Sequence, residues 1–123
     1  QTLEYSQRLR DQRRNALPFD QPSTGQGLYV AACKGGSQAL GRKSGAIAEG
    51  QLADLMALDS TLPSLCALKA EQLIDGWIFA STEKTVTDVW SAGRHCVKNG
   101  RHHRREAIAS QFRKTMAGLQ ARL

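Results

Sequence analysis

Histidine is the residue type best suited to acid–base or metal chemistry near neutral pH, and the sequence contains three of them. His95 falls on an expected strand, whereas His102 and His103 are adjacent in a basic turn. We expect the two neighbouring rings to point apart, and no carboxylate stands at ligand spacing beside them. The histidine pattern therefore predicts a surface role for each ring and no metal site.

Two short segments have some features of phosphate-binding or nucleophilic motifs, but neither has the required spacing. The segment 41–45, GRKSG, lacks the G-x-x-x-x-G-K-[ST] pattern and precedes a strand rather than opening a helix. Ser37 lies in Gly-Gly-Ser-Gln and not in the G-x-S-x-G of a nucleophile elbow. Four aspartates that could do acid–base chemistry are scattered, with no pair among them at helical spacing: Asp54, Asp59, Asp75 and Asp88. The residues predict no catalytic, cofactor-binding or metal-binding site in this chain.

Length and charge limit the classes of protein further. A chain of 123 residues can bury one modest core, and it is too short for a (β/α)8 barrel of about 250 residues. The net charge of +6 suits an anionic partner, but basic surface residues occur on many enzymes. No apolar run approaches the roughly 18 residues of a membrane span. We therefore expect no membrane association, and nucleic acid is not the expected partner.

The first residue of the sequence and its cysteines indicate how the protein is processed and in which compartment it lies. The first residue is Gln1 rather than Met, which leads us to expect a processed or internal segment of a longer chain, and no signal peptide opens it. Cys33, Cys66 and Cys96 are odd in number and form no CxxC motif, which argues against a disulfide framework or a thiolate zinc site. Reduced thiols in a cytoplasmic protein are the expectation.

Apolar spacing and turn residues predict the elements. Helices are expected over 1–15, from Ser23 or Thr24 to about Leu40, over 70–80, and over about 104–122, and strands over 53–58 and 85–98. The strand pair turns at 92–93, and Asn99-Gly100 marks a further turn.

Two features of these helices predict how they pack. Gly35-Gly36 should indicate close packing or a helix break. Glu4 and Arg8 form a favourable i,i+4 pair on what we expect to be a solvated face.

Two longer segments resemble a known family. Residues 44–59, SGAIAEGQLADLMALD, match the pattern G-x-I-x-x-G-x-x-A-D-L-x-x-L-D of the amidohydrolase superfamily, and residues 86–101, VTDVWSAGRHCVKNGR, resemble the hairpin that follows it. The matching positions in the two segments are Gly45, Ile47, Gly50, Ala53, Asp54, Leu55, Leu58, Asp59, Val86, Val89, Gly93, Arg94, Val97, Gly100 and Arg101. Further likeness over 3–15, 35–41, 77–80 and 100–102 points to the formimidoylglutamate deiminase branch.

The resemblance implies an α/β fragment of a larger enzyme. Residues 1–43 would end the helical layer of a (β/α)8 barrel, 44–100 would supply strands of a small β-sandwich with an inserted short helix, and 101–123 would form a C-terminal helix. Asp54 and Asp59 would bracket a strand rather than form a catalytic pair. The family uses a divalent metal, commonly zinc, to activate water as the nucleophile and to polarise the imino carbon. The motifs that hold this metal are absent from the sequence, so the chain is expected to bind none.

The implied parent hydrolyses N-formimino-L-glutamate to N-formyl-L-glutamate and ammonia in histidine degradation, and this chain alone is expected to be inactive. A fragment with incomplete apolar faces and strand edges should need the rest of the enzyme or self-association, and a homo-oligomer is expected. Three alternatives remain open. They are a fragment of another amidohydrolase, such as a deaminase or an imidazolonepropionase-like enzyme, a non-catalytic truncated homologue, and a basic interaction module built on the arginines at 8–14 and 101–105.

Overall fold

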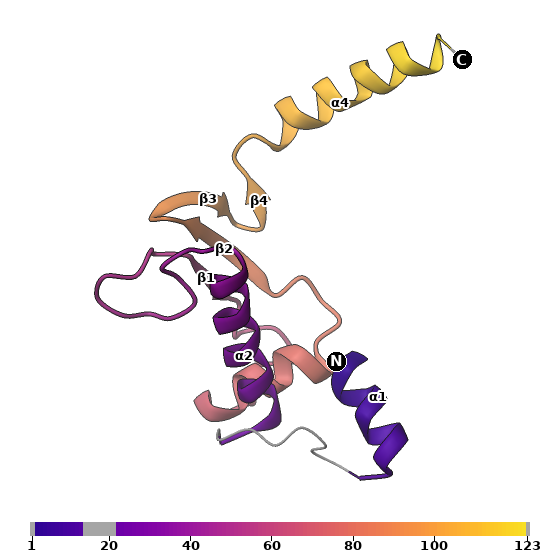
Figure 1. Cartoon of the computed structure of the whole chain (residues 1–123). Coiled ribbons are helices and arrows are strands. Elements are labelled where there is room, and N and C mark those ends of the chain that lie inside the picture. Colours follow the sequence, from indigo (N-terminus) through magenta and orange to yellow (C-terminus); the bar gives the residue numbers. More distant parts are fainter. Residues whose placement is uncertain (1, 14–21, 123) are drawn as a thin grey trace.

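The computed structural model describes residues 2–13 and 22–122, and it shows a small antiparallel sheet flanked by helices (Figure 1). The strands are β1 (Leu55–Leu58), β2 (Val86–Ser91), β3 (Arg94–Lys98) and β4 (Arg101–His102). They lie in the order β1-β2-β3-β4, and each neighbouring pair is antiparallel. The mixed α/β class with antiparallel strands is confirmed, and β4 extends the sheet past the boundary expected at residue 100.

Both predicted turns are present, and their backbone explains their residues. Ala92 and Gly93 have φ values of 48° and 79° and join β2 to β3, and Asn99 and Gly100 have values of 49° and 70° and join β3 to β4. Two successive positive φ angles characterise the type I′ turn, whose twist matches that of a hairpin. Asn and Gly tolerate this region well, whereas Ala92 adopts it against the preference of an L-residue with a β-carbon.

Helix α2 (Thr24–Ala39) begins where the sequence predicts. The side chain of Ser23 caps it by accepting a hydrogen bond from Gln26 N at 3.2 Å. The expectation for Gly35-Gly36 was wrong, because the helix continues through both residues and open space surrounds their Cα atoms. The helix therefore forms despite the low helix propensity of the two glycines, and no packed neighbour accounts for them.

The helix predicted over 70–80 is present but irregular. It consists of η1 (Ala70–Gln72), α3 (Leu73–Asp75) and η2 (Gly76–Ala80). The whole segment begins as a 3₁₀ turn, continues as one α-helical turn and ends in π-type geometry. This irregular helix packs against α2, where the Trp77 and Tyr29 rings meet edge to face with centroids 5.8 Å apart. Among the described residues, Leu65 is the one apolar side chain that is fully buried, and it lies beneath this helix, near Gly76.

Helix α1 (Thr2–Asp11) corrects the expectation of a solvated face. The predicted pair is present, with Arg8 Nε 2.8 Å from Glu4 Oε1, but the Glu4 side chain is fully buried. Aromatic rings lie beside this pair: the Tyr5 and Phe79 rings are 6.0 Å apart, and the Arg8 guanidinium lies over both rings. This cluster attaches α1 to η2, and the prediction for residues 14 and 15 lies outside the described residues.

Helix α4 (Arg105–Gln120) extends away from the sheet and ends far from the other helices (Figure 1). It is the helix predicted from the apolar residues spaced three and four apart. None of its residues is buried. In the part of the chain that the structure describes, no helix is long and apolar enough to cross a membrane.

Candidate functional site

The closest approach of titratable side chains on the sheet joins Asp88 and His95. Asp88 Oδ1 lies 2.7 Å from His95 Nε2, and the His95 ring stacks on Trp90 with centroids 4.5 Å apart. The β2–β3 pairing explains the cluster, because Trp90 lies opposite His95 and Asp88 is two residues away on the same strand face. The sequence analysis did not predict this contact. The two-residue turn at 92–93 could have indicated it, because such a turn sets which residues of the two strands lie opposite each other.

The cluster has the character of a structural contact. The Thr87 hydroxyl and, second, His95 hold the pKa of Asp88 below its ordinary value, while desolvation opposes them. A carboxylate and one imidazole are two potential ligands, whereas metal sites in proteins commonly use three or more protein ligands. Among the residues that the structure describes, no group of three or more His, Cys, Asp or Glu side chains could hold a metal ion.

The other two histidines stack on each other, and the expectation that their rings point apart was wrong. The centroids of the His102 and His103 rings are 4.5 Å apart, with an angle of 23° between the planes. Hydrogen bonding on opposite sides explains the arrangement. His103 Nδ1 lies 3.0 Å from the Cys96 carbonyl oxygen, and His102 Nδ1 accepts from Arg104 N at 3.1 Å. Both Nδ1 atoms are thus occupied by backbone groups.

Asp54 holds the turn between β2 and β3 in place. Its Oδ1 accepts a hydrogen bond from Ala92 N at 2.7 Å, and its carboxylate lies 3.2 Å from an Arg42 nitrogen. Gly93 N also donates to the Ala53 carbonyl oxygen at 2.9 Å. The aspartate of the segment 44–59 therefore has a structural contact in this chain, on the turn where the backbone adopts positive φ.

The other two of the four aspartates considered in the sequence, Asp59 and Asp75, also bond to backbone groups. Asp59 Oδ1 accepts from the Thr61 hydroxyl at 2.6 Å and from Thr61 N at 2.9 Å, and these bonds lower the pKa of Asp59. Asp75 Oδ1 accepts from Gly25 N at 2.9 Å, which ties α3 to the first turn of α2. Asp54 and Asp59 do flank β1, and the structure brings none of the four aspartates into a carboxylate pair.

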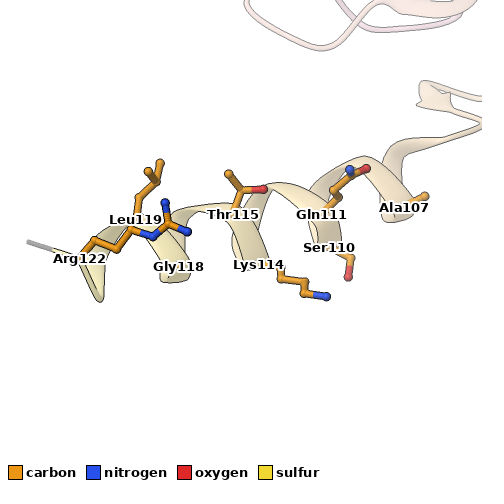
Figure 2. A pocket seen from close by; sticks show the side chains of 8 residues that line it. All are labelled: Ala107, Ser110, Gln111, Lys114, Thr115, Gly118, Leu119 and Arg122. Carbon is orange, nitrogen blue, oxygen red and sulfur yellow. The ribbon is translucent and has the colours of Figure 1, made fainter.

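A surface hollow lies along α4, and one helix face forms it. Figure 2 shows its lining side chains, which come from α4 and the turn directly after it: Ala107, Ser110, Gln111, Lys114, Thr115, Gly118, Leu119 and Arg122. A ligand pocket normally encloses most of its ligand between several elements. A single helix cannot provide that enclosure, so this hollow is an uncovered surface and no candidate active site.

Comparisons with known proteins relate the chain to a larger enzyme. No family model matches it. It is 47% identical over 111 residues to formimidoylglutamate deiminase from Pseudomonas aeruginosa, which covers 89% of this chain and 24% of that protein. The crystal structure of an amidohydrolase from Brucella melitensis matches with a TM-score of 0.79 and 38% identity over 96% of this chain and 26% of that chain.

The chain is similar to part of formimidoylglutamate deiminase and to part of an amidohydrolase. Identity of 47% together with a TM-score of 0.79 confirms the resemblance inferred from the segments 44–59 and 86–101. The chain spans about a quarter of the length of each relative.

Proposed function

We propose that these 123 residues are the C-terminal part of a metal-dependent amidohydrolase whose intact form hydrolyses N-formimino-L-glutamate. The observation that carries the proposal is the 47% identity over 111 residues to a formimidoylglutamate deiminase. The structural similarity to an amidohydrolase supports the reaction class independently. Residues 1–43 would then belong to the helical layer of the barrel, 44–100 to the small β-sandwich, and 101–123 to the C-terminal helix.

The proposed reaction is the hydrolysis of a carbon–nitrogen double bond. The oxygen of water bonds to the imino carbon, and the resulting tetrahedral carbon loses its terminal nitrogen as ammonia. The two hydrogens of water pass to the departing nitrogen, and the carbon retains oxygen as a formyl group. N-formyl-L-glutamate and ammonia are therefore formed in equal amounts, without any change in oxidation state.

The residues described here do not fit the divalent metal that this chemistry uses. They form no group of three potential ligands, and the nearest pair, Asp88 and His95, bond to each other. The metal, with zinc as the expected ion, would be held by residues outside this chain. We assign no step of the reaction to any of the 123 residues, whose proposed contribution is to complete the fold of a cytoplasmic enzyme.

Ammonia release from N-formimino-L-glutamate tests the proposal in two preparations, the full-length protein that contains this chain and the 123-residue chain alone. We expect the full-length protein to form N-formyl-L-glutamate and ammonia in equal amounts, and the short chain to form neither. Turnover by the short chain would contradict the assignment of the catalytic residues to the rest of the enzyme. Activity on a cyclic substrate such as imidazolonepropionate alone would favour a different amidohydrolase.

The fold also supports a dependence on other polypeptide. Eleven large apolar side chains are exposed among the described residues, and one is fully buried. The short chain should therefore self-associate or melt without cooperativity, and the intact enzyme is expected to be a homo-oligomer. A monodisperse monomer of the short chain with a cooperative thermal transition would contradict this expectation. Steeply salt-dependent binding to DNA would instead favour a basic interaction module.

A further inference from the structure

Helix α4 presents an apolar stripe that the described part of the chain leaves uncovered. The stripe consists of Ile108, Phe112, Met116 and Leu119, whose spacings of four, four and three place them on one helix face. Their exposed fractions are 52%, 63%, 48% and 50%. The helix projects away from the sheet (Figure 1), so no helix or strand at the other end of the molecule reaches it. A stripe of this kind normally faces a protein core or a partner.

Cations stand at both ends of the α4 stripe. Arg105 lies three residues before Ile108, on the same helix surface. Arg122 lies in the turn after α4, where its backbone N donates to the Leu119 carbonyl oxygen at 3.0 Å. Glu106 is the single acidic residue of α4, and its Oε1 lies 2.7 Å from an Arg101 nitrogen. A surface that covers the stripe therefore meets a positive charge at each end.

These charges disfavour pairing of α4 with α4 of a second copy. An antiparallel pair that sets Ile108 against Leu119 brings Arg105 beside Arg122 at both ends. A parallel pair brings each arginine beside its own equivalent. Like charges at these positions repel one another in either arrangement. The stripe therefore suits a surface of different sequence, with an apolar floor and acidic side chains at its two ends.

The relatives supply the space for such a surface. About three quarters of the length of formimidoylglutamate deiminase, and of the Brucella amidohydrolase, lies outside the region that matches this chain. We propose that α4 docks through its apolar stripe into a groove with acidic ends, formed by the part of the same polypeptide that lies outside these 123 residues. This inference rests on the proposed function, because it requires the longer enzyme.

Photo-crosslinking in the full-length protein tests the docking directly. A photoreactive phenylalanine analogue replaces Phe112 in one variant and Ala117, on the opposite helix face, in the control. We expect irradiation to join position 112 to a peptide outside the 123 residues within a single chain, and position 117 to give little product. A band of twice the chain mass from position 112 would show docking on a second copy and overturn the proposal. Equal, weak labelling at both positions would show an uncovered helix and overturn it too.

Thermal unfolding of point variants tests the docking without the photoreactive analogue. Phe112→Asp should lower the melting temperature of the full-length protein by several degrees and make α4 sensitive to protease, whereas Ala117→Asp places the same residue on the other face and should do neither. The subunit mass in solution should not change in either variant. Equal melting temperatures of the two variants would contradict docking.

The experiments distinguish a failure of the docking proposal from a failure of the proposed reaction. Lack of turnover of N-formimino-L-glutamate with an intact crosslink from position 112 refutes only the substrate. Normal turnover with no crosslink from position 112 refutes only the docking.

Discussion

Helices α2 and α4 both have 16 residues, but their surroundings differ completely. The first turn of α2 is capped by Ser23 and held by the Asp75 carboxylate, and Gly25 and Gly27 are buried. The residue preceding α4 is Arg104, which makes no side-chain cap, and no residue of α4 is buried. One helix is thus integrated into the fold of this chain, and the other is not.

The difference shows which helix the described residues cover and which they leave exposed. Around α2, backbone approaches are so close that Gly25 leaves no space for a β-carbon beside Asp75. In α4, by contrast, a β-carbon added to Gly118 would meet no atom within 4 Å. Because an apolar helix face is stabilised by burial rather than by propensity, α4 gains the least stability from contacts among the described residues.

The largest effect is expected from Gly25→Ala. The new β-carbon would lie 2.8 Å from Asp75 Oδ1 and 2.9 Å from Asp75 Cα, so the backbone of α3 would have to move. Overpacking of this kind costs about 1–3 kcal/mol. Chemical denaturation of the full-length protein should show this loss. The matched changes Gly35→Ala and Gly118→Ala meet open space and should stabilise by up to about 1 kcal/mol. Equal effects at all three glycines would remove the contrast between the helices.

Asp54→Ala should have the next largest effect, because it removes the acceptor for Ala92 N. A hydrogen bond to a charged group contributes about 1.5–3 kcal/mol, and the partial exposure of the Asp54 side chain places the loss near the lower end. Asp54→Asn retains an acceptor oxygen and should lose less. Denaturation midpoints of the two variants would measure the difference, and identical midpoints would argue against the role of the carboxylate in the turn.

Asparagine substitutions at two alanines should change stability in opposite directions. Ala92 has a φ of 48°, and Asn adopts this region more readily, so Ala92→Asn should stabilise by about 0.5–1 kcal/mol. Ala117→Asn lies in regular α4, where Asn has the lower helix propensity, and should destabilise by about 0.5 kcal/mol. Thermal unfolding of both variants checks the signs. A loss of stability at position 92 would contradict the turn geometry.

The smallest effect concerns pH and Asp88. Because the pKa of this carboxyl is lower in the folded protein than its ordinary value of about 3.9, its ionised form stabilises the fold. The contribution is complete above that ordinary value and is lost as the pH falls through the lower folded value. The stability difference between the wild type and Asp88→Asn should therefore shrink between about pH 5 and about pH 1. A difference that is constant over this range would argue against a lowered pKa of Asp88, to which the Thr87 hydroxyl contributes most and His95 less.

Local features of the sequence predicted the elements well. Ala92-Gly93 and Asn99-Gly100 marked turns that the structure confirms, and Ser23 marked the start of α2, because turn and cap preferences act over a few residues. The expected pair of Glu4 and Arg8 is also present. The resemblance to amidohydrolases rested on the two segments 44–59 and 86–101, and the comparisons confirm it.

Contacts between distant residues were not predictable from the sequence. The rings of Tyr5 and Phe79 meet although these residues lie 74 positions apart in the sequence, and Glu4, next to Tyr5, is fully buried. The bond between Asp88 and His95 depends on the register of β2 and β3, which shifts between Val89 and Trp90. Apolar periodicity carries no information on such pairings, because it describes one element at a time.

The sequence by itself determined where helices and turns form, and it contained the motifs that relate the chain to amidohydrolases. It also determined the apolar stripe of α4, because that stripe follows from residue spacing alone. Only the tertiary structure decided that Glu4 is buried, that the rings of His102 and His103 stack, and that α4 stands apart from the sheet. Spacing sets which face of an element is apolar, whereas the surface that covers the face is set by residues far along the polypeptide.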